Sequence, residues 1–574
     1  MTTTAPTNMV SITLNGQPLE VASGTTVLDA AKDFGLSIPT LCSNDRLRTL
    51  GACRLCLVEV DSEEQLHSAC SFTLTDSVDI QTHSPRVLAS RRMTMELLLA
   101  RSANNSEQFN GREPFHQLVH EMGIRQQRFL PGSLPAPTDM SSPALQFNPN
   151  ACIQCGLCVA VCNDMQDVHA INFSGRGIEQ SIQAGLEQDL ADTECNACGQ
   201  CAVVCPTGAF VEQDGTADVI SALGDGSKVV IAAVMPAAQI GIGPEFGFAP
   251  GEDQGGKLVN GLKKTGFDFV FDAGFGHDLA TMEAAFELRQ RVAAGENLPL
   301  IISSCPSLVK QIEHLYPELI PNLSKNRSPS QMFGRILKSY YSEKLGRNST
   351  DIVVVQITSC LSSKYERARH ELDGVDVSLT TREAARLLRT ASGYDLAQLS
   401  PMEFDAPFGE ASGASALSEV SGGTAEAILR TIGDLVTGAD LDESVCTEIR
   451  GQKPVREAEI EIGDTVFRVA VAQELGHGNT LLERVKQVES PHHLIEIMAC
   501  PGGCAGGGGQ PLDCMSDQGG EISDALVRKD RERPVRKPRS NRQLNQVYAE
   551  FLKAPYGEQS KRHLQTEYTV RGRY

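Results

Sequence analysis

The sequence has no tryptophan, few other aromatic residues and fewer basic than acidic residues. None of its 574 residues is Trp and only 5% are aromatic, which argues against the aromatic stacking surfaces of single-strand nucleic-acid binders. Lys and Arg number 51 against 72 Asp and Glu, so the formal net charge is -21 at pH 7. Because phosphate backbones and anionic membranes repel such a chain, we expect it to bind neither.

Long apolar runs are also missing. No window approaches about eighteen consecutive apolar residues, the length that spans a bilayer. The first residues, MTTTAPTNMV, do not combine a cationic region with an apolar run. We therefore expect no membrane insertion, no secretory signal and a cytoplasmic location. The length predicts about three to five domains.

Cysteine, in contrast, is abundant, with 18 residues. Disulfides are rare in reducing compartments, so clustered cysteines there indicate metal sites. Eight of them form two runs of identical spacing, C-x2-C-x2-C-x3-C, the second followed by Pro206. The doubled pattern is typical of two [4Fe-4S] clusters, in which the last cysteine of each run binds the other cluster. The predicted ligands are Cys152, Cys155, Cys158 and Cys205 for one cluster, and Cys195, Cys198, Cys201 and Cys162 for the other.

A further group of cysteines lies in an N-terminal segment with the pattern of a β-grasp domain. Apolar residues alternate over 10–14, Asn15-Gly16 predicts a hairpin turn, and Thr25 or Thr26 can cap a following helix. Four thiolates on a loop of such a domain suit a [2Fe-2S] cluster, although the first gap is longer than in plant ferredoxins. Zinc is the alternative here, and paired zinc knuckles are the alternative for the doubled runs. The four cysteines are Cys42, Cys53, Cys56 and Cys70.

From about residue 228 onward, apolar segments typical of buried strands alternate with amphipathic helices, which predicts an α/β domain with a mostly parallel core. Three of these segments lead into Cys305, Cys360 and Cys500. Since α/β folds place ligands at the carboxyl ends of strands, these thiols can converge, and Cys504 makes a fourth. We attribute the glycines of the loop CPGGCAGGGGQP to backbone that passes close to a bulky inorganic group. Two remaining cysteines, Cys446 and Cys514, are expected to be ordinary thiols.

The segment IEIMACPGGCAGGGGQP resembles the most diagnostic motif of the [FeFe]-hydrogenases, and the resemblance spans nearly the whole chain. It implies a multidomain α/β protein. The implied parts are a [2Fe-2S] β-grasp domain (1–82), a helical segment (83–140), a double [4Fe-4S] ferredoxin domain (141–216), an α/β catalytic domain (217–522) and a helical, small-subunit-like C-terminal tail (523–574).

The resemblance also implies an H-cluster, a [4Fe-4S] cubane joined to a diiron subcluster that carries CO, CN and azadithiolate. Cys305, Cys360 and Cys500 fall on the cubane ligands and Cys504 on the bridging cysteine, while Met498 matches the methionine of the motif. The implied reaction is reversible H2 oxidation and proton reduction. The implied partners are ferredoxin or a flavoprotein or NADH-linked subunit, together with maturation proteins. We expect no NAD or flavin in this chain.

The residues that handle protons depart from the family pattern. Ser304 stands where the family has a proton-donating cysteine, and a hydroxyl is a far weaker acid than a thiol with a pKa near 8.5. Of two glutamates on the proton path, one position is Ala284 and the other is Glu287, and Ser324 matches a serine on that path. We therefore expect slow or biased turnover.

Other departures lie beside the cluster and in the helical segment. Ser363 replaces a lysine that hydrogen-bonds a cyanide ligand, and Lys364 can compensate only from the next position. An accessory cluster of larger members has no ligands here, because its positions hold Arg101, Asn105, Gln108 and Pro114. These changes favour an alternative function, a redox or H2 sensor or an electron-transfer subunit with little H2 turnover. The basic run 528–542 is expected to be a solvated tail along the surface.

Overall fold

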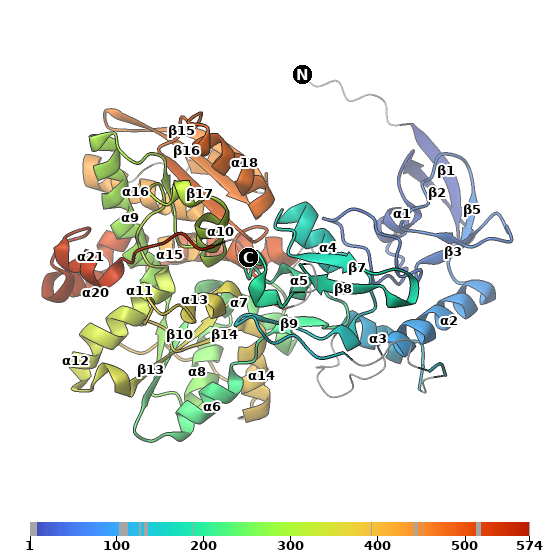
Figure 1. The fold of residues 1–574 in the computed structure, drawn as a ribbon, viewed down its shortest axis with the longest axis horizontal. Helices are drawn as coiled ribbons and strands as arrows, with labels where there is room; N and C mark the ends of the chain where they lie inside the picture. The colour runs from blue at the N-terminus through green and yellow to red at the C-terminus, as the bar shows by residue number, and fades with distance from the viewer. Residues whose placement is uncertain are drawn as a thin grey trace.

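The computed structural model describes residues 8–102, 113–125, 128–130, 136–185, 188–391, 393–439, 441, 446–451, 453–511 and 518–572. Figure 1 shows three parts in a row: the N-terminal sheet at one end, the ferredoxin-like part in the middle and a large α/β domain at the other end. Within the described ranges, no helix is both long and apolar enough to cross a membrane. Asn105, Gln108 and Cys514 lie outside the described residues.

The N-terminal part is a five-stranded sheet in the order β2-β1-β5-β3-β4 with one helix, α1 (Val27–Asp33). Asn15 and Gly16 both have positive φ, 51° and 81°, as a tight two-residue hairpin between β1 and β2 requires. Thr26 caps α1 by accepting a hydrogen bond from the amide of Asp29, so the predicted hairpin and cap are confirmed. The strands are β1 (Met9–Leu14), β2 (Gln17–Ala22), β3 (Leu57–Val60), β4 (His67–Ser68) and β5 (Asp79–Gln81).

The middle part is built from two similar halves. Each half has a short helix that begins after a glycine in the left-handed conformation, Gly156 before α4 (Leu157–Ala160) and Gly199 before α5 (Gln200–Val203). Two antiparallel pairs complete it, β6 (Leu145–Phe147) with β9 (Phe210–Glu212), and β7 (Ile171–Ser174) with β8 (Ser181–Ala184). The preceding segment forms α2 (Pro85–Arg101) and α3 (Pro114–Glu121).

The α/β domain has two four-stranded sheets. The first, β11-β10-β13-β14, is wholly parallel, and the second, β12-β17-β16-β15, is parallel except for the β15–β16 hairpin. The predicted, mostly parallel core is therefore confirmed. The strands are β10 (Val229–Val234), β11 (Phe269–Asp272), β12 (Leu300–Ile301), β13 (Ile352–Thr358), β14 (Val377–Thr380), β15 (Val455–Ile462), β16 (Thr465–Gln473) and β17 (Leu494–Met498).

Helices surround both sheets (Figure 1). The longest, α9 (Gly274–Ala294), is the element on which much of the site below depends. The others are α6 (Thr216–Gly224), α7 (Pro236–Gly241), α8 (Gly255–Thr265), α10 (Pro306–Leu315), α11 (Pro329–Ile336), α12 (Ser342–Leu345), α13 (Ser362–Arg367), α14 (Thr381–Ala391), α15 (Gly413–Leu417), α16 (Gly423–Thr437), α18 (Leu475–Lys486), α19 (Gln518–Glu532), α20 (Arg542–Val547) and α21 (Glu558–Leu564).

The basic C-terminal run lies along the surface of the α/β domain with several of its residues exposed, and it is also held there by carboxylates. Arg533 pairs at 2.6 Å with Asp272, which is buried at the end of β11. Lys537 and Arg539 both pair with Asp434 of α16. Carboxylates of the α/β domain thus pair with basic residues whose partners are not apparent from the sequence.

Candidate active site and cluster sites

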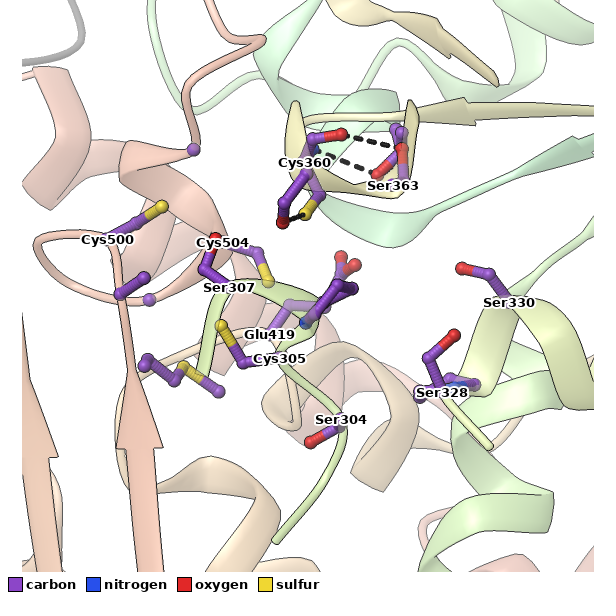
Figure 2. A pocket seen from close by; sticks show the side chains of 18 of the residues that line it. Ser304, Cys305, Ser307, Ser328, Ser330, Cys360, Ser363, Glu419, Cys500 and Cys504 are labelled. Carbon is purple, nitrogen blue, oxygen red and sulfur yellow. Dashed lines mark hydrogen bonds between the residues drawn. The ribbon is translucent and has the colours of Figure 1, made fainter. Parts of the chain in front are cut away.

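Four cysteines meet at the carboxyl ends of strands from the two sheets. Cys305, Cys360 and Cys500 follow β12, β13 and β17, and Cys504 lies four residues beyond Cys500. All four line one cavity with a volume of about 60 Å³. Figure 2 shows the Cys305, Cys360 and Cys504 side chains directed toward a common space. The predicted convergence is therefore confirmed by the geometry.

The glycine-rich loop lies close to protein backbone, which differs from the reason we predicted for its glycines. A Cβ atom on Gly507 would lie 2.4 Å from the carbonyl oxygen of Ser359, next to Cys360. A Cβ atom on Gly508 would lie 2.4 Å from the carbonyl oxygen of Cys198. Both distances are far below van der Waals contact, so only glycine lets these cysteine-bearing loops approach one another.

Burial makes the four thiols poor acids unless a positive charge compensates. Burial raises the pKa of Cys360 to about 12, and the charge of Cys305 contributes to that rise. Burial likewise raises the pKa of Cys504, with a contribution from the Glu419 carboxylate. Iron would supply the missing positive charge, since metal binding deprotonates thiols. The donor set therefore fits an iron–sulfur group.

Within the described residues, no group of three or more Cys, His, Asp or Glu side chains is arranged to hold a single metal ion.

The ferredoxin-like part brings its two cysteine runs together as the spacing predicts. Burial raises the pKa of Cys152 to about 12, and the Cys205 thiolate of the other run contributes. In the same way burial raises the pKa of Cys162 to about 12, with a contribution from Cys195. Each run thus places its last cysteine beside the other run, which is the arrangement that two interleaved clusters need.

The four N-terminal cysteines form two close pairs. The amide of Cys53 donates to the Cys42 sulfur at 3.3 Å. Burial, followed by the charge of Cys56, raises the pKa of Cys70 to about 12. Two pairs suit a [2Fe-2S] cluster, because each of its irons takes two cysteines.

Thiols of separate sites also lie near one another. Burial raises the pKa of Cys155, and Cys53 of the N-terminal sheet is among the thiolates that raise it further. Burial raises the pKa of Cys198 as well, and Cys500 of the active-site cavity contributes. Cys42 and Cys53 belong to the same buried core as Cys155 and its neighbours. The sites therefore follow one another from the N-terminal sheet to the active-site cavity.

Two predicted proton-path residues remain connected. The Ser324 hydroxyl donates to the Glu287 carboxylate at 2.6 Å, and Glu287 pairs with Arg291 at 2.7 Å. Ser304 lines the active-site cavity and also a second, smaller cavity that Ser324 and Ala284 line. The structure thus connects Ser324, Glu287 and Arg291 directly, whereas Ser304 and Ala284 contribute no carboxylate to the smaller cavity.

Ser363 and Met498 both line the active-site cavity. The Ser363 hydroxyl donates to the carbonyl oxygen of Cys360 at 2.7 Å, so its one proton is already used. Lys364 does not take over, because its ammonium group bonds Glu383 at 2.9 Å and the carbonyl of Ser378 at 2.7 Å, away from the cavity.

Sequence reasoning missed several polar side chains of the cavity. His277, Glu366, Glu419 and Glu496 all line it, and Glu419 accepts a hydrogen bond from the amide of Ala237, directly after Pro236. The available signal was a carboxylate within the small-residue segment 411–425, where an acidic side chain has no obvious surface role. Arg101 ends α2 and donates to the carbonyl of Gln180 at 2.8 Å, and Pro114 begins α3.

Known proteins resemble this chain along its whole length. Residues 228–508 match the iron only hydrogenase large subunit, C-terminal domain. Two curated relatives are the NADP-reducing hydrogenase subunit HndD of Solidesulfovibrio fructosivorans, 37% identical over 99% of this chain and 100% of the relative, and iron hydrogenase 1 of Clostridium pasteurianum, 33% identical over 95% and 97%. The chain belongs to the [FeFe]-hydrogenase family. It is a hydrogenase-like iron–sulfur oxidoreductase.

Further matches agree with the family. Residues 7–85 match a 2Fe-2S iron-sulfur cluster binding domain, 151–209 a 4Fe-4S dicluster domain and 523–571 the iron hydrogenase small subunit. A solved structure of an apo [FeFe]-hydrogenase HydA1 variant from Chlamydomonas reinhardtii is 31% identical, with a TM-score of 0.57 over 63% of this chain and 100% of that one. The family carries iron–sulfur clusters and a hydrogenase-type active site, and both belong to this chain too.

Proposed function

We propose that this chain interconverts H2 with protons and electrons at an H-cluster held by Cys305, Cys360, Cys500 and Cys504. The observation that carries the proposal is the meeting of these four partly buried thiols around one cavity at the carboxyl ends of β12, β13 and β17. When bound, the H-cluster would supply the metal that splits H2 heterolytically. This chain's residues would hold it, exclude water and pass protons.

We infer that electrons leave through the two [4Fe-4S] clusters and the [2Fe-2S] cluster on the ligands predicted above. Support comes from the nearness of Cys500 to Cys198 and of Cys155 to Cys53. The route does not need the accessory cluster, because the N-terminal sheet lies against the ferredoxin-like part. The partner would be a cytoplasmic ferredoxin or a flavoprotein subunit that reduces a nicotinamide, as the name of the HndD relative suggests.

The test is to produce the chain anaerobically with the family's maturation proteins and record its infrared spectrum and H2 evolution with a strong reductant. Bands of CO and CN together with H2 evolution are the expected result. A folded protein that carries its other clusters but lacks these bands would contradict the proposal.

A second candidate function is redox or H2 sensing, or electron transfer with little H2 turnover. It is favoured by Ser304 and Ala284, which interrupt the inner part of the proton path. Co-purification separates the two: a flavin-containing subunit supports the oxidoreductase, whereas a kinase or phosphatase supports sensing.

A further inference from the structure

His277 lies between the two cavities described above. It lies in the first turn of α9 and lines both the cysteine cavity and the smaller cavity. Its side chain is buried, with 5% of the residue exposed. The Nε2 atom lies 3.5 Å from the Glu419 carboxylate, and among the described residues it has no partner that meets hydrogen-bond geometry. A buried imidazole nitrogen in this state requires an explanation.

The smaller cavity occupies the place of the lost carboxylate. It is lined by Ala284 and Ser324 as well as His277, and its volume is about 20 Å³. A space needs at least about 10–15 Å³ and polar partners to hold a water molecule. The cavity therefore has room for one water between the imidazole and Ser324.

Helix α9 carries the residues of this route on one face. His277, Ala284, Glu287 and Arg291 follow at spacings of seven, three and four residues, and such spacings place side chains on the same side of a helix. Glu287 is fully buried, whereas the Arg291 side chain is 12% exposed. The stripe thus leads from the cysteine cavity toward the surface, with one gap at Ala284.

Only a few residues touch both cavities. Among the described residues these are His277, Ser304 and Pro329. Proline has no titratable group, and a serine hydroxyl is too weak an acid to hold or release a proton by itself near neutral pH. An imidazole has two ring nitrogens, so it can accept a proton at one and donate a proton from the other.

The carboxylates of the cysteine cavity are less suited to this role. Both oxygens of Glu496 accept hydrogen bonds, from the amides of Gly422 and Ala425 at 2.7 Å. Glu366 accepts from Ser328 at 2.8 Å. Neither of them lines the smaller cavity, and Glu419 does not line it either.

We propose that His277 is the proton-transfer residue of this chain, and that it exchanges protons with Ser324 and Glu287 through a water in the smaller cavity. The inference rests on the proposed function. During H2 oxidation, both electrons of H2 leave through the clusters and its two protons leave one at a time. The imidazole accepts each proton from the cysteine cavity and releases it to the water, and so returns to its starting state.

The test compares four variants of the metal-loaded enzyme. His277→Gln keeps a polar side chain that cannot carry a proton, and Ala284→Leu fills the water cavity while the imidazole of His277 is kept. Ser304→Ala tests the competing route, and His492→Gln is the matched control, because His492 is equally buried, at 5% exposure, and lies outside both cavities. Each is measured for H2 evolution, solvent isotope effect and infrared bands, and the wild type and Ala284→Leu are crystallised at high resolution.

The first two variants are expected to keep the CO and CN bands, while H2 evolution falls by about tenfold or more. The loss of one proton-transfer group can lower a rate by up to about 10⁴-fold. Their solvent isotope effect should rise. The wild-type crystals should show a water within hydrogen-bond distance of His277 and Ser324, and the Ala284→Leu crystals should not.

Wild-type activity in His277→Gln, or a dry smaller cavity in the wild type, would overturn the inference. A loss confined to Ser304→Ala would do the same. A wild-type enzyme without the CO and CN bands would contradict the proposed function instead, and in that case the crystallographic water still decides for or against the route.

Discussion

The residues that bind the clusters, here called the electron side, and the residues that would pass protons, here called the proton side, differ in how much change they tolerate. On the electron side, all sixteen predicted cluster cysteines are present, and the described structure brings them together in groups. On the proton side, the resemblance predicts a thiol and a carboxylate at the positions of Ser304 and Ala284. A cluster iron needs a ligand atom fixed at each coordination position, whereas a proton route needs only successive donors and acceptors. A water molecule or a histidine can therefore carry protons past a position whose side chain cannot.

The largest effect is expected on the electron side at Cys504. Cys504→Ala should abolish H2 evolution, by about a hundredfold or more, because the predicted bridging thiolate is lost while the remaining clusters still bind. The measurement is H2 evolution together with the electron paramagnetic resonance signals of the reduced [4Fe-4S] clusters.

Cys446→Ala is the matched control, because Cys446 is a buried cysteine in the core of the α/β domain, away from the cavity. It should leave H2 evolution within about twofold of the wild type. A Cys504→Ala enzyme that keeps a tenth of the activity would show that this cysteine is not a ligand.

A second change separates electron transfer from chemistry at the site. Gly508→Ala places a methyl group 2.4 Å from the carbonyl oxygen of Cys198 and so forces apart the two loops that bring Cys198 near Cys500. Overpacking of this kind typically costs about 1–3 kcal/mol. We expect slower H2 evolution from an external electron donor, and a smaller change in isotope exchange between H2 and solvent, which needs no donor.

Gly520→Ala is the control, because nothing lies within 4 Å of a Cβ atom built at Gly520 of α19. Equal losses in both assays for Gly508→Ala would mean that the substitution disturbs the active site itself.

The proposed proton route can be tested further by introducing the cysteine that the family resemblance implies. Ser304→Cys introduces a group with a pKa near 8.5 in place of a much weaker acid. If His277 already carries protons, the gain in H2 evolution should stay below about tenfold. A much larger gain would show that proton transfer at Ser304 limits H2 evolution and that the route through His277 contributes little.

The sequence predicted the electron side far better than the proton side. Cysteine spacing reports directly on cluster type, so the pairing of Cys205 with the first run could be inferred from the chain alone. The role of His277 could not, because it depends on a cavity opened by Ala284 and lined by Ser324, which lies forty residues further along the chain. The carboxylate partners of Arg533, Lys537 and Arg539 could not be predicted for a similar reason, because they come from distant segments.

The smallest effect is expected at Glu283, one turn of α9 before Glu287. Its carboxylate is buried beneath the C-terminal tail and accepts hydrogen bonds from the Tyr548 hydroxyl at 2.7 Å, the Tyr556 amide at 2.9 Å and the Ser560 hydroxyl at 3.1 Å. Burial raises its pKa from 4.5 to about 7 in spite of these bonds. The folded state therefore binds the proton more tightly than the unfolded state. Its contribution to stability is fully present below about pH 4.5 and is lost as the pH rises through 7.

Glu283→Gln removes this titration while the amide oxygen can still accept hydrogen bonds. The melting temperature of the variant should therefore fall less than that of the wild type between pH 5 and 8, by the equivalent of about 1–2 kcal/mol. Glu550→Gln is the control from the same tail, because hydrogen bonding to Lys344 lowers the Glu550 pKa to about 2 and keeps that carboxylate ionised throughout this range. Identical pH slopes in the wild type and Glu283→Gln would mean that Glu283 is already ionised in the folded protein. The C-terminal tail would then cover an ionised carboxylate on α9, and this part of the helix would bind no extra proton in the folded state.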